Sequence, residues 1–178
     1  MTCLKKLTPF LVLCSFFAVS CGVVKPQQTQ SSTQEKLDKK AADLADLKGA
    51  TVASVSLEDG AKALKITFDS GILFGFNKSE LGSEAKASLD RLVKGIADMP
   101  DSKIRVCGHT DIVGSAEANQ AVSAKRAKEV ANYLVEKGIA ANRITAEGLS
   151  FTQPVADNST EAGRAKNRRV EVFVIPAQ

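Results

Sequence analysis

Two amphipathic helices set among strand-like segments constrain this chain more than any other feature. Residues 83–99 place apolar side chains at helical spacing before Pro100, and residues 115–137 do the same before Gly138. Apolar and polar residues alternate in the segments around them, which is typical of half-buried strands. These segments are residues 51–57, 63–68, 103–107, 143–146 and 169–175. We predict an α+β fold, a two-layer sandwich with helices on one face of a mixed sheet that begins with a β-hairpin.

The first 20 residues are typical of a secretory signal peptide. Two lysines precede a largely apolar run, residues 7–19, and small residues lead up to Cys21. That run is shorter than the roughly 20 residues that a membrane-spanning helix needs. One alternative is a plain signal cut near Ser20. We favour the other, because the segment resembles a bacterial lipoprotein signal, in which Cys21 receives acyl chains such as palmitate and becomes the mature N-terminus.

The segment that follows is predicted to be a flexible tether, residues 21–49. Its first part is rich in Gln, Ser and Thr and poor in apolar residues. Leu37, Ala41 and Leu44 recur at helical intervals, which favours a short amphipathic helix over residues 37–47 rather than more linker, although a helix this short is only marginally stable alone. We therefore expect the folded domain to occupy residues 50–178.

Composition excludes some classes of function. The net charge is +4, the chain has no Trp and one Tyr, and no basic run is interleaved with aromatic residues. Nucleic-acid binding therefore has little support. Cys107 is the one cysteine inside the predicted domain, so no disulfide is expected within it.

A Gly-His-Thr-Asp turn, residues 108–111, directly precedes the second long helix. Arg126 lies about three turns into that helix. It is one turn from Val122 and Val130, so it can bury its stem beside the apolar stripe and present its guanidinium at a groove rim. Asp111 and Arg126 together could grip a ligand that carries both an ammonium and a carboxylate, since guanidinium geometry suits a carboxylate well.

Several short motifs occur in order, and together they resemble the OmpA-like C-terminal domain, the peptidoglycan-binding module also found in peptidoglycan-associated lipoproteins. The motifs are FGFNKSEL (74–81), GHTDIVG (108–114), Asn119, VSAKRA (122–127), GI–NRI–EG (138–148) and NRRVEV (167–172). The resemblance covers residues 72–174. It implies non-covalent binding of the diaminopimelate of the peptidoglycan stem peptide, with Asp111 facing its ammonium and Arg126 its carboxylate. With the lipoprotein-like signal, it implies a lipid-anchored outer-membrane protein whose periplasmic domain holds the cell wall.

The resemblance brings further residues to the site. Asn77, Thr110 and Asn119 fall on positions near the ligand, and Asn119 would bind the ligand or hold the turn. Arg168 would either bind the ligand or pair with carboxylates or carbonyls at the start of the last strand. The chain departs from the family pattern at Gly75 and Asn77, where many members carry aspartates.

Two other classes of function remain to be weighed. The fold could serve mainly as a docking module for envelope protein partners. An enzyme is disfavoured, because no paired-carboxylate or Ser/Cys–His constellation is recognisable. Cys107 and His109 alone are too few ligands for a metal site, and no cofactor is expected. We expect His109 to pack under the turn, with one ring nitrogen bonded to the backbone.

Overall fold

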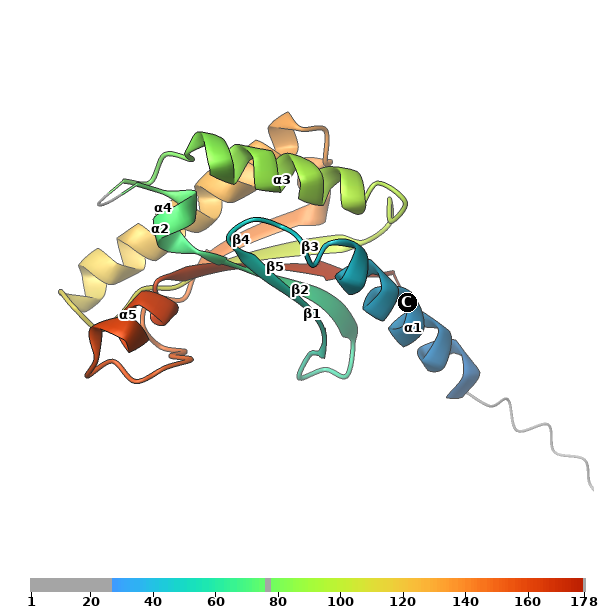
Figure 1. Cartoon of the computed structure of the whole chain (residues 1–178), viewed down its shortest axis with the longest axis horizontal. Coiled ribbons are helices and arrows are strands. Elements are labelled where there is room, and N and C mark those ends of the chain that lie inside the picture. Colours follow the sequence, from blue (N-terminus) through green and yellow to red (C-terminus); the bar gives the residue numbers. More distant parts are fainter. Residues whose placement is uncertain (1–26, 76–77, 178) are drawn as a thin grey trace, which may run out of the picture.

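The computed structural model describes residues 27–75 and 78–177 and contains a five-stranded sheet in the order β1-β2-β5-β3-β4 (Figure 1). Its strands are β1 (Ala50–Ser56), β2 (Lys62–Asp69), β3 (Lys103–Gly108), β4 (Ile144–Gly148) and β5 (Arg169–Ile175). The β1–β2 hairpin and the pairs of β5 with β2 and β3 are antiparallel, while β3 and β4 are parallel. The predicted mixed sheet is confirmed, and its last strand lies at its centre.

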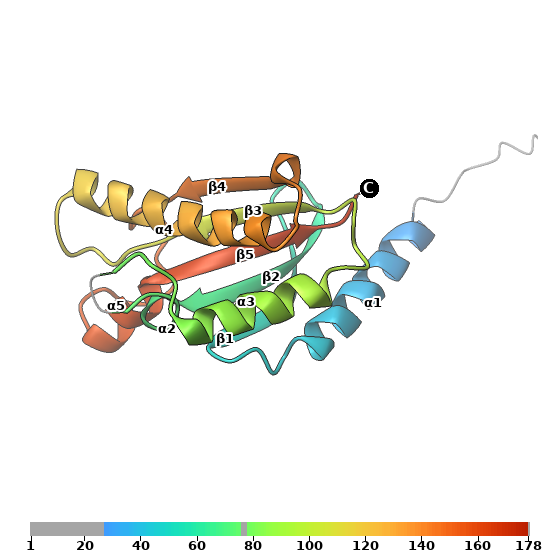
Figure 2. The same ribbon diagram turned by 90° about the horizontal axis from the view of Figure 1, so that it is seen from above.

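The two long helices, α3 (Ser83–Gly95) and α4 (Ala116–Glu136), lie side by side on one face of the sheet (Figures 1 and 2). The predicted two-layer α+β architecture is therefore confirmed. Shorter helical segments are α2 (Ser70–Leu73), the 3₁₀ turn η1 (Ala141–Arg143) and α5 (Glu161–Asn167). The side chain of Ser115 caps α4 by accepting a hydrogen bond from the backbone N–H of Ala118.

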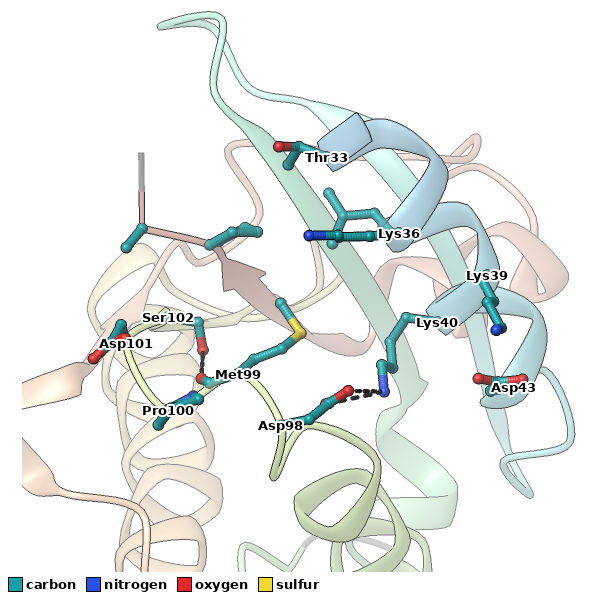
Figure 3. Close-up of a pocket in the computed structure, with 13 residues that line it drawn as sticks. Thr33, Lys36, Lys39, Lys40, Asp43, Asp98, Met99, Pro100, Asp101 and Ser102 are labelled. Carbon is teal, nitrogen blue, oxygen red and sulfur yellow. Dashed lines mark hydrogen bonds and ion pairs between the residues drawn. The ribbon is translucent and has the colours of Figure 1, made fainter. Parts of the chain in front are cut away.

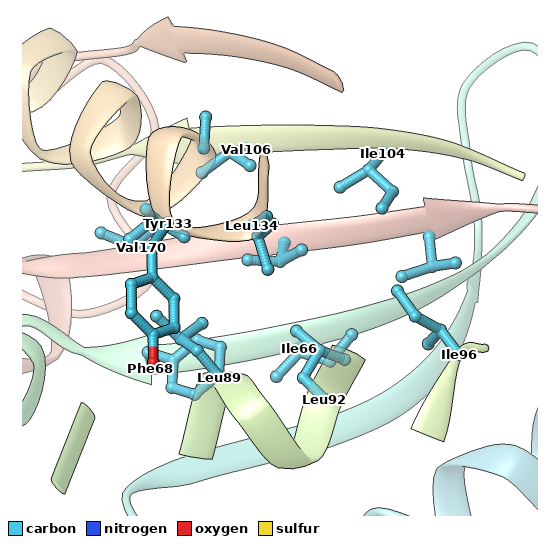
Figure 4. Close-up of a cluster of buried hydrophobic side chains, with 14 of the residues drawn as sticks. Ile66, Phe68, Leu89, Leu92, Ile96, Ile104, Val106, Tyr133, Leu134 and Val170 are labelled. Atoms are coloured by element: carbon cyan, nitrogen blue, oxygen red, sulfur yellow. The ribbon is translucent and has the colours of Figure 1, made fainter. Parts of the chain in front are cut away.

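The hydrophobic core fills the space between these helices and the sheet (Figure 4). It includes Ile66, Phe68, Leu89, Leu92, Ile96, Ile104, Val106, Tyr133, Leu134 and Val170. At Gly108 the helix α4 approaches β3 so closely that a Cβ would overlap the carbonyl group of Ser123. Glycine is therefore required at this crossing, which fixes the position of α4 over the sheet.

The segment predicted to be a tether forms a 17-residue helix, α1 (Gln27–Asp43), and folds onto the domain. Leu37, Leu44 and Leu47 are at most 3% exposed and belong to the main core. The helix packs over β1 and β2, and Lys40 forms an ion pair of 3.0 Å with Asp98 across a groove of about 700 Å³ (Figure 3). Packing of Leu37, and of Leu44 and Leu47 directly after the helix, stabilises against the domain a helix that is marginal alone.

Cys21 and the predicted signal peptide lie outside the described residues. Helix α1 lies towards one end of the long axis, whereas the turn after β3, the start of α4 and α5 lie towards the other (Figures 1 and 2). The predicted binding residues therefore lie far from the N-terminal part of the fold.

Candidate ligand-binding site

The turn after β3 is held by segments that are distant in the sequence. The backbone N–H of His109 donates to the carbonyl of Arg169 at 2.9 Å, and that of Thr110 donates to the carbonyl of Ser150 at 2.9 Å. These acceptors belong to β5 and to the segment after β4, the two neighbours of β3 in the sheet. Asp111 follows at once and is 8% exposed, so the sheet itself positions this carboxylate.

Asp111 already has two hydrogen-bond donors. Its Oδ1 accepts from the backbone N–H of Val113 at 3.0 Å, and its Oδ2 accepts from Nη1 of Arg168 at 2.7 Å. Arg168 also donates from Nη2 to Glu161 at 2.8 Å. The bond to Asp111 raises the pKa of Arg168 against the opposing effect of burial, and Glu161 adds to the rise. Of the two roles predicted for Arg168, the structure shows carboxylate pairing.

Arg126 approaches the same place from α4. Its guanidinium lies over the ring of Phe74, with 5.4 Å between Cζ and the ring centroid, and its Nη2 is 3.4 Å from the carbonyl oxygen of Lys78. Burial and the positive charge of Arg168 lower the pKa of Arg126, while Asp111 raises it. Asp111 and Arg126 do not form an ion pair, yet the electrostatic coupling places Asp111, Arg126 and Arg168 in one neighbourhood.

Several polar atoms around this turn are buried without a hydrogen-bond partner among the described residues, and they include Nε of Arg126 and Oγ1 of Thr110, besides both ring nitrogens of His109 and Oγ of Ser150. Thr110 is 5% exposed and directly precedes Asp111. Buried polar groups are usually hydrogen-bonded, so such atoms call for an explanation, and a ligand is one.

Asn119 holds the turn. Its side-chain Nδ2 donates to the carbonyl of Val113 at 3.0 Å, and the residue is 8% exposed. Of the two roles predicted for Asn119, binding the ligand or holding the turn, the structure shows it holding the turn. Asn77 lies outside the described residues.

Beneath the turn that carries Asp111, charged side chains gather around the buried carboxylate of Glu171. His109 is 1% exposed and packs under the turn as predicted, but its Nε2 faces Oε2 of Glu171 at 3.6 Å instead of a backbone group. Glu171 also pairs with Lys65 at 2.8 Å and with Arg169 at 2.9 Å. Burial alone would raise the pKa of Glu171, but the nearby His109 and the ion pairs with Lys65 and Arg169 outweigh it and hold the pKa well below its ordinary value.

This cluster was not predicted from the sequence. The sequence feature that could have indicated it is the charged pair Arg169 and Glu171, which falls on one face of an otherwise apolar strand.

The thiol of Cys107 is directed at a carboxylate of β4. This thiol is buried and lies 3.3 Å from Oε1 of Glu147, to which it donates. Burial and the bond to Glu147 raise the pKa of Cys107 to about 12, so the thiol stays protonated at neutral pH.

The described part of the chain contains no group of three or more His, Cys, Asp or Glu side chains placed to hold a metal ion. Within residues 27–75 and 78–177, no helix combines the length and the apolar character needed to cross a bilayer.

Comparisons with known proteins show which proteins this chain is similar to. The chain is 38% identical over 122 residues to the peptidoglycan-binding protein ArfA of Mycobacterium tuberculosis, covering 68% of this chain and 37% of that protein. It is 38% identical over 109 residues to the outer-membrane lipoprotein YfiB of Pseudomonas aeruginosa, covering 61% of this chain and 64% of that protein. The chain thus spans less than two thirds of the length of both relatives.

Among solved structures, the cell wall anchor of the T6SS from Pseudomonas aeruginosa superposes with a TM-score of 0.66 at 30% identity, covering 81% of this chain and 99% of that one. A family model described as the OmpA family matches residues 73–168, more than half of the chain. This match includes Asp111, Arg126 and Arg168, and it shows that the chain belongs to the OmpA family.

Proposed function

We propose that this protein binds peptidoglycan non-covalently through the diaminopimelate of the stem peptide. The observation that carries the proposal is the half-buried guanidinium of Arg126, which has no carboxylate within 4.0 Å among the described residues although buried Asp111 is within electrostatic reach. A half-buried cation without a direct anionic partner favours an incoming anion.

The chemistry of the ligand fits these groups. The far end of diaminopimelate carries an ammonium and a carboxylate on the same carbon. Arg126 would take the carboxylate with two parallel N–H donors, and Asp111 would take the ammonium while Arg168 holds it in place. The free hydroxyl of Thr110 adds a donor or acceptor beside Asp111.

The comparisons support the same ligand class. ArfA is described as peptidoglycan-binding, and the solved structure is described as a cell wall anchor. Each description is that of its own protein, and we extend it to this chain because the matched region contains the site. Gly75 and Asn77 stand where an acid is common in the family, so the ammonium here would depend mainly on Asp111.

We further propose that acyl chains on Cys21 anchor the protein in the outer membrane, with the domain in the periplasm. YfiB is described as an outer-membrane lipoprotein. Residues 22–26 alone separate Cys21 from α1, which limits the reach of this segment to about 20 Å. Labelling with a palmitate analogue tests this step: wild type should be labelled and Cys21→Ser should not, and equal labelling of the two would refute it.

Sedimentation with insoluble peptidoglycan tests the ligand. Wild-type protein should pellet, Asp111→Ala and Arg126→Ala should remain in the supernatant, and free diaminopimelate should compete where lysine does not. Lys125→Ala is a matched control, because Lys125 is exposed and adjacent to Arg126. Wild type that fails to pellet, or variants that pellet equally well, would contradict the proposal.

A second candidate function is docking of an envelope protein. Ile112 and Val113, directly after Asp111, are 54% and 63% exposed, and a pair of exposed apolar side chains at a loop tip suits a protein contact. Crosslinking in cells separates the candidates: dominant protein–protein products that persist in Arg126→Ala but are lost in Ile112→Ser would favour docking.

A further inference from the structure

Strand β1 is an edge strand without the features that usually protect an edge. It is the terminal strand of the sheet, and its seven residues, ATVASVS, include no charged residue and no proline. Its register with β2 runs without a bulge from Ala50 to Ser56. Natural edge strands are commonly blunted by charges, prolines or bulges. The opposite edge, β4, is shorter and carries Glu147.

The backbone groups on the free edge can be assigned. Gly49 accepts from Asp69, and Leu57 donates to Ala61, so odd-numbered residues of this segment face β2. In an antiparallel pair these directions alternate along the strand, so the N–H and C=O groups of Val52 and Ser54 point away from the sheet. Ser54 contacts α1 through its hydroxyl, which Gln34 reaches at 2.9 Å, and this contact leaves its backbone groups uninvolved.

We propose that β1 pairs antiparallel with β1 of a second copy of this chain, which joins the two sheets into one. With Ala53 opposite Ala53 of the second copy, all seven residues overlap, and the outward-facing Val52 lies opposite the outward-facing Ser54. This register pairs the free N–H and C=O groups of Val52 and Ser54 between the copies, whereas the N–H of Ala50 already donates to the carbonyl of Leu47 at 3.2 Å.

Charge complementarity supports this register. Lys48 lies five positions before Ala53 and Glu58 lies five positions after it, just outside the two ends of β1, so the register would bring each Lys48 towards Glu58 of the other copy. Lys48 now pairs with Glu84, but both side chains are more than 60% exposed, and exposed pairs of this kind are easily exchanged.

The rest of the fold leaves the edge accessible. Helix α1 packs over β1 and β2 on the face that carries α3 and α4, while the edge itself lies in the plane of the sheet (Figures 1 and 2). Ala53 is exposed and lies opposite Lys65 of β2 in the strand register. The side chain of Lys65 pairs with Glu171 on the face of the sheet that the helices do not cover. A two-fold axis at Ala53, perpendicular to the sheet, would place both copies of α1 on the same face of the joined sheet.

Disulfide trapping tests the register on the full-length protein in its own membranes. At the two-fold position the Cα atoms of residue 53 would be about 4.5 Å apart, within the range of a disulfide. Ala53→Cys should give a crosslinked dimer under mild oxidation. Thr145→Cys, at an exposed position of the other edge strand, is the matched control and should stay monomeric. No more dimer from Ala53→Cys than from Thr145→Cys would overturn the proposal.

Charge variants test the same joint without a new thiol. In sedimentation of the detergent-extracted full chain, Ala53→Lys and Glu58→Lys should shift dimer towards monomer, and Lys48→Glu combined with Glu58→Lys should restore the dimer. Thr145→Lys should have no effect. A wild-type chain that is monomeric throughout would refute the proposal.

Failure of this joint and failure of peptidoglycan binding can be told apart, because the two surfaces are separate. Ala53→Lys should still pellet with peptidoglycan. The double variant Ala53→Cys with Asp111→Ala should crosslink as well as Ala53→Cys alone. Loss of crosslinking in the double variant would contradict the separation of the two surfaces.

Discussion

Asp111 and Arg168 are 57 residues apart in the chain, and their side chains meet at 2.7 Å. The sheet brings them together, because β3 pairs with β5 so that Gly108 lies opposite Val170, and both charged residues lie just beyond this pair. The site is therefore a product of strand register, and any ligand that binds Asp111 meets a carboxylate that already has a cationic partner.

The Asp111–Arg168 pair should show a measurable coupling energy. Asp111→Asn and Arg168→Gln should each lower the free energy of unfolding, and the double variant should lose about 1 kcal/mol less than the sum, because the pair is only partly exposed. Urea unfolding of the four proteins measures this coupling, which should shrink in high salt. Arg91→Gln combined with Asp111→Asn should be additive, since Arg91 pairs with Asp46 and shares no partner with Asp111.

Glu171 should make stability depend on pH on the acid side. Because its folded pKa lies below the ordinary value of 4.5, its stabilising contribution is present above about pH 4.5 and is lost as the pH falls below that value. Glu171→Gln should lower the free energy of unfolding at pH 7 by about 3 kcal/mol, because it leaves Lys65 and Arg169 without their carboxylate.

Urea unfolding at pH 7 and pH 3 provides the measurement. The variant should show a flatter profile than wild type across this interval. Glu136→Gln, at an exposed position, serves as the control and should follow wild type. Parallel profiles for wild type and Glu171→Gln would show that the cluster does not stabilise the fold.

Helix α1 should contribute to the stability of the domain. Leu44 is 2% exposed and lies against Gly95 of α3, where an added Cβ would come within 2.5 Å of it. Leu44→Ala should lower the free energy of unfolding by about 2–4 kcal/mol, as is usual for a buried leucine. Val135→Ala, at a 41% exposed position, should cost far less. An unchanged unfolding midpoint for Leu44→Ala would mean that α1 is only a tether.

The close approach at Gly108 should be intolerant of a side chain. Gly108→Ala places a methyl group against the carbonyl of Ser123, so α4 must shift, and we expect a loss of about 3 kcal/mol. Because α4 carries Arg126, retention on peptidoglycan should fall as well. Gly75→Ala meets only the side chain of Lys78, at 3.6 Å, and should leave the melting temperature near that of wild type. Equal melting temperatures for the two variants would contradict this interpretation.

The sequence predicted what depends on local pattern. Alternation and helical periodicity identified the strands and the helices α3 and α4, and the motif order identified the family. It predicted only a short, marginal helix where the 17-residue α1 lies, because Leu37 and Leu44 acquire a partner only when the sheet is formed. It also left the role of Arg168 open and missed Glu171 as a charge centre. These roles depend on which strands are neighbours, and local periodicity does not encode that order.

The central position of β5 has a consequence for how the chain acquires its structure. Among the strands it is synthesised last, yet it alone joins the β1–β2 hairpin to the β3–β4 pair. Until β5 is available, the β1–β2 hairpin and the β3–β4 pair share no strand. Each then exposes an apolar strand edge that lacks its partner strand. We therefore expect the sheet to be completed late in folding, and chains that end before Arg169 should fail to form the native sheet.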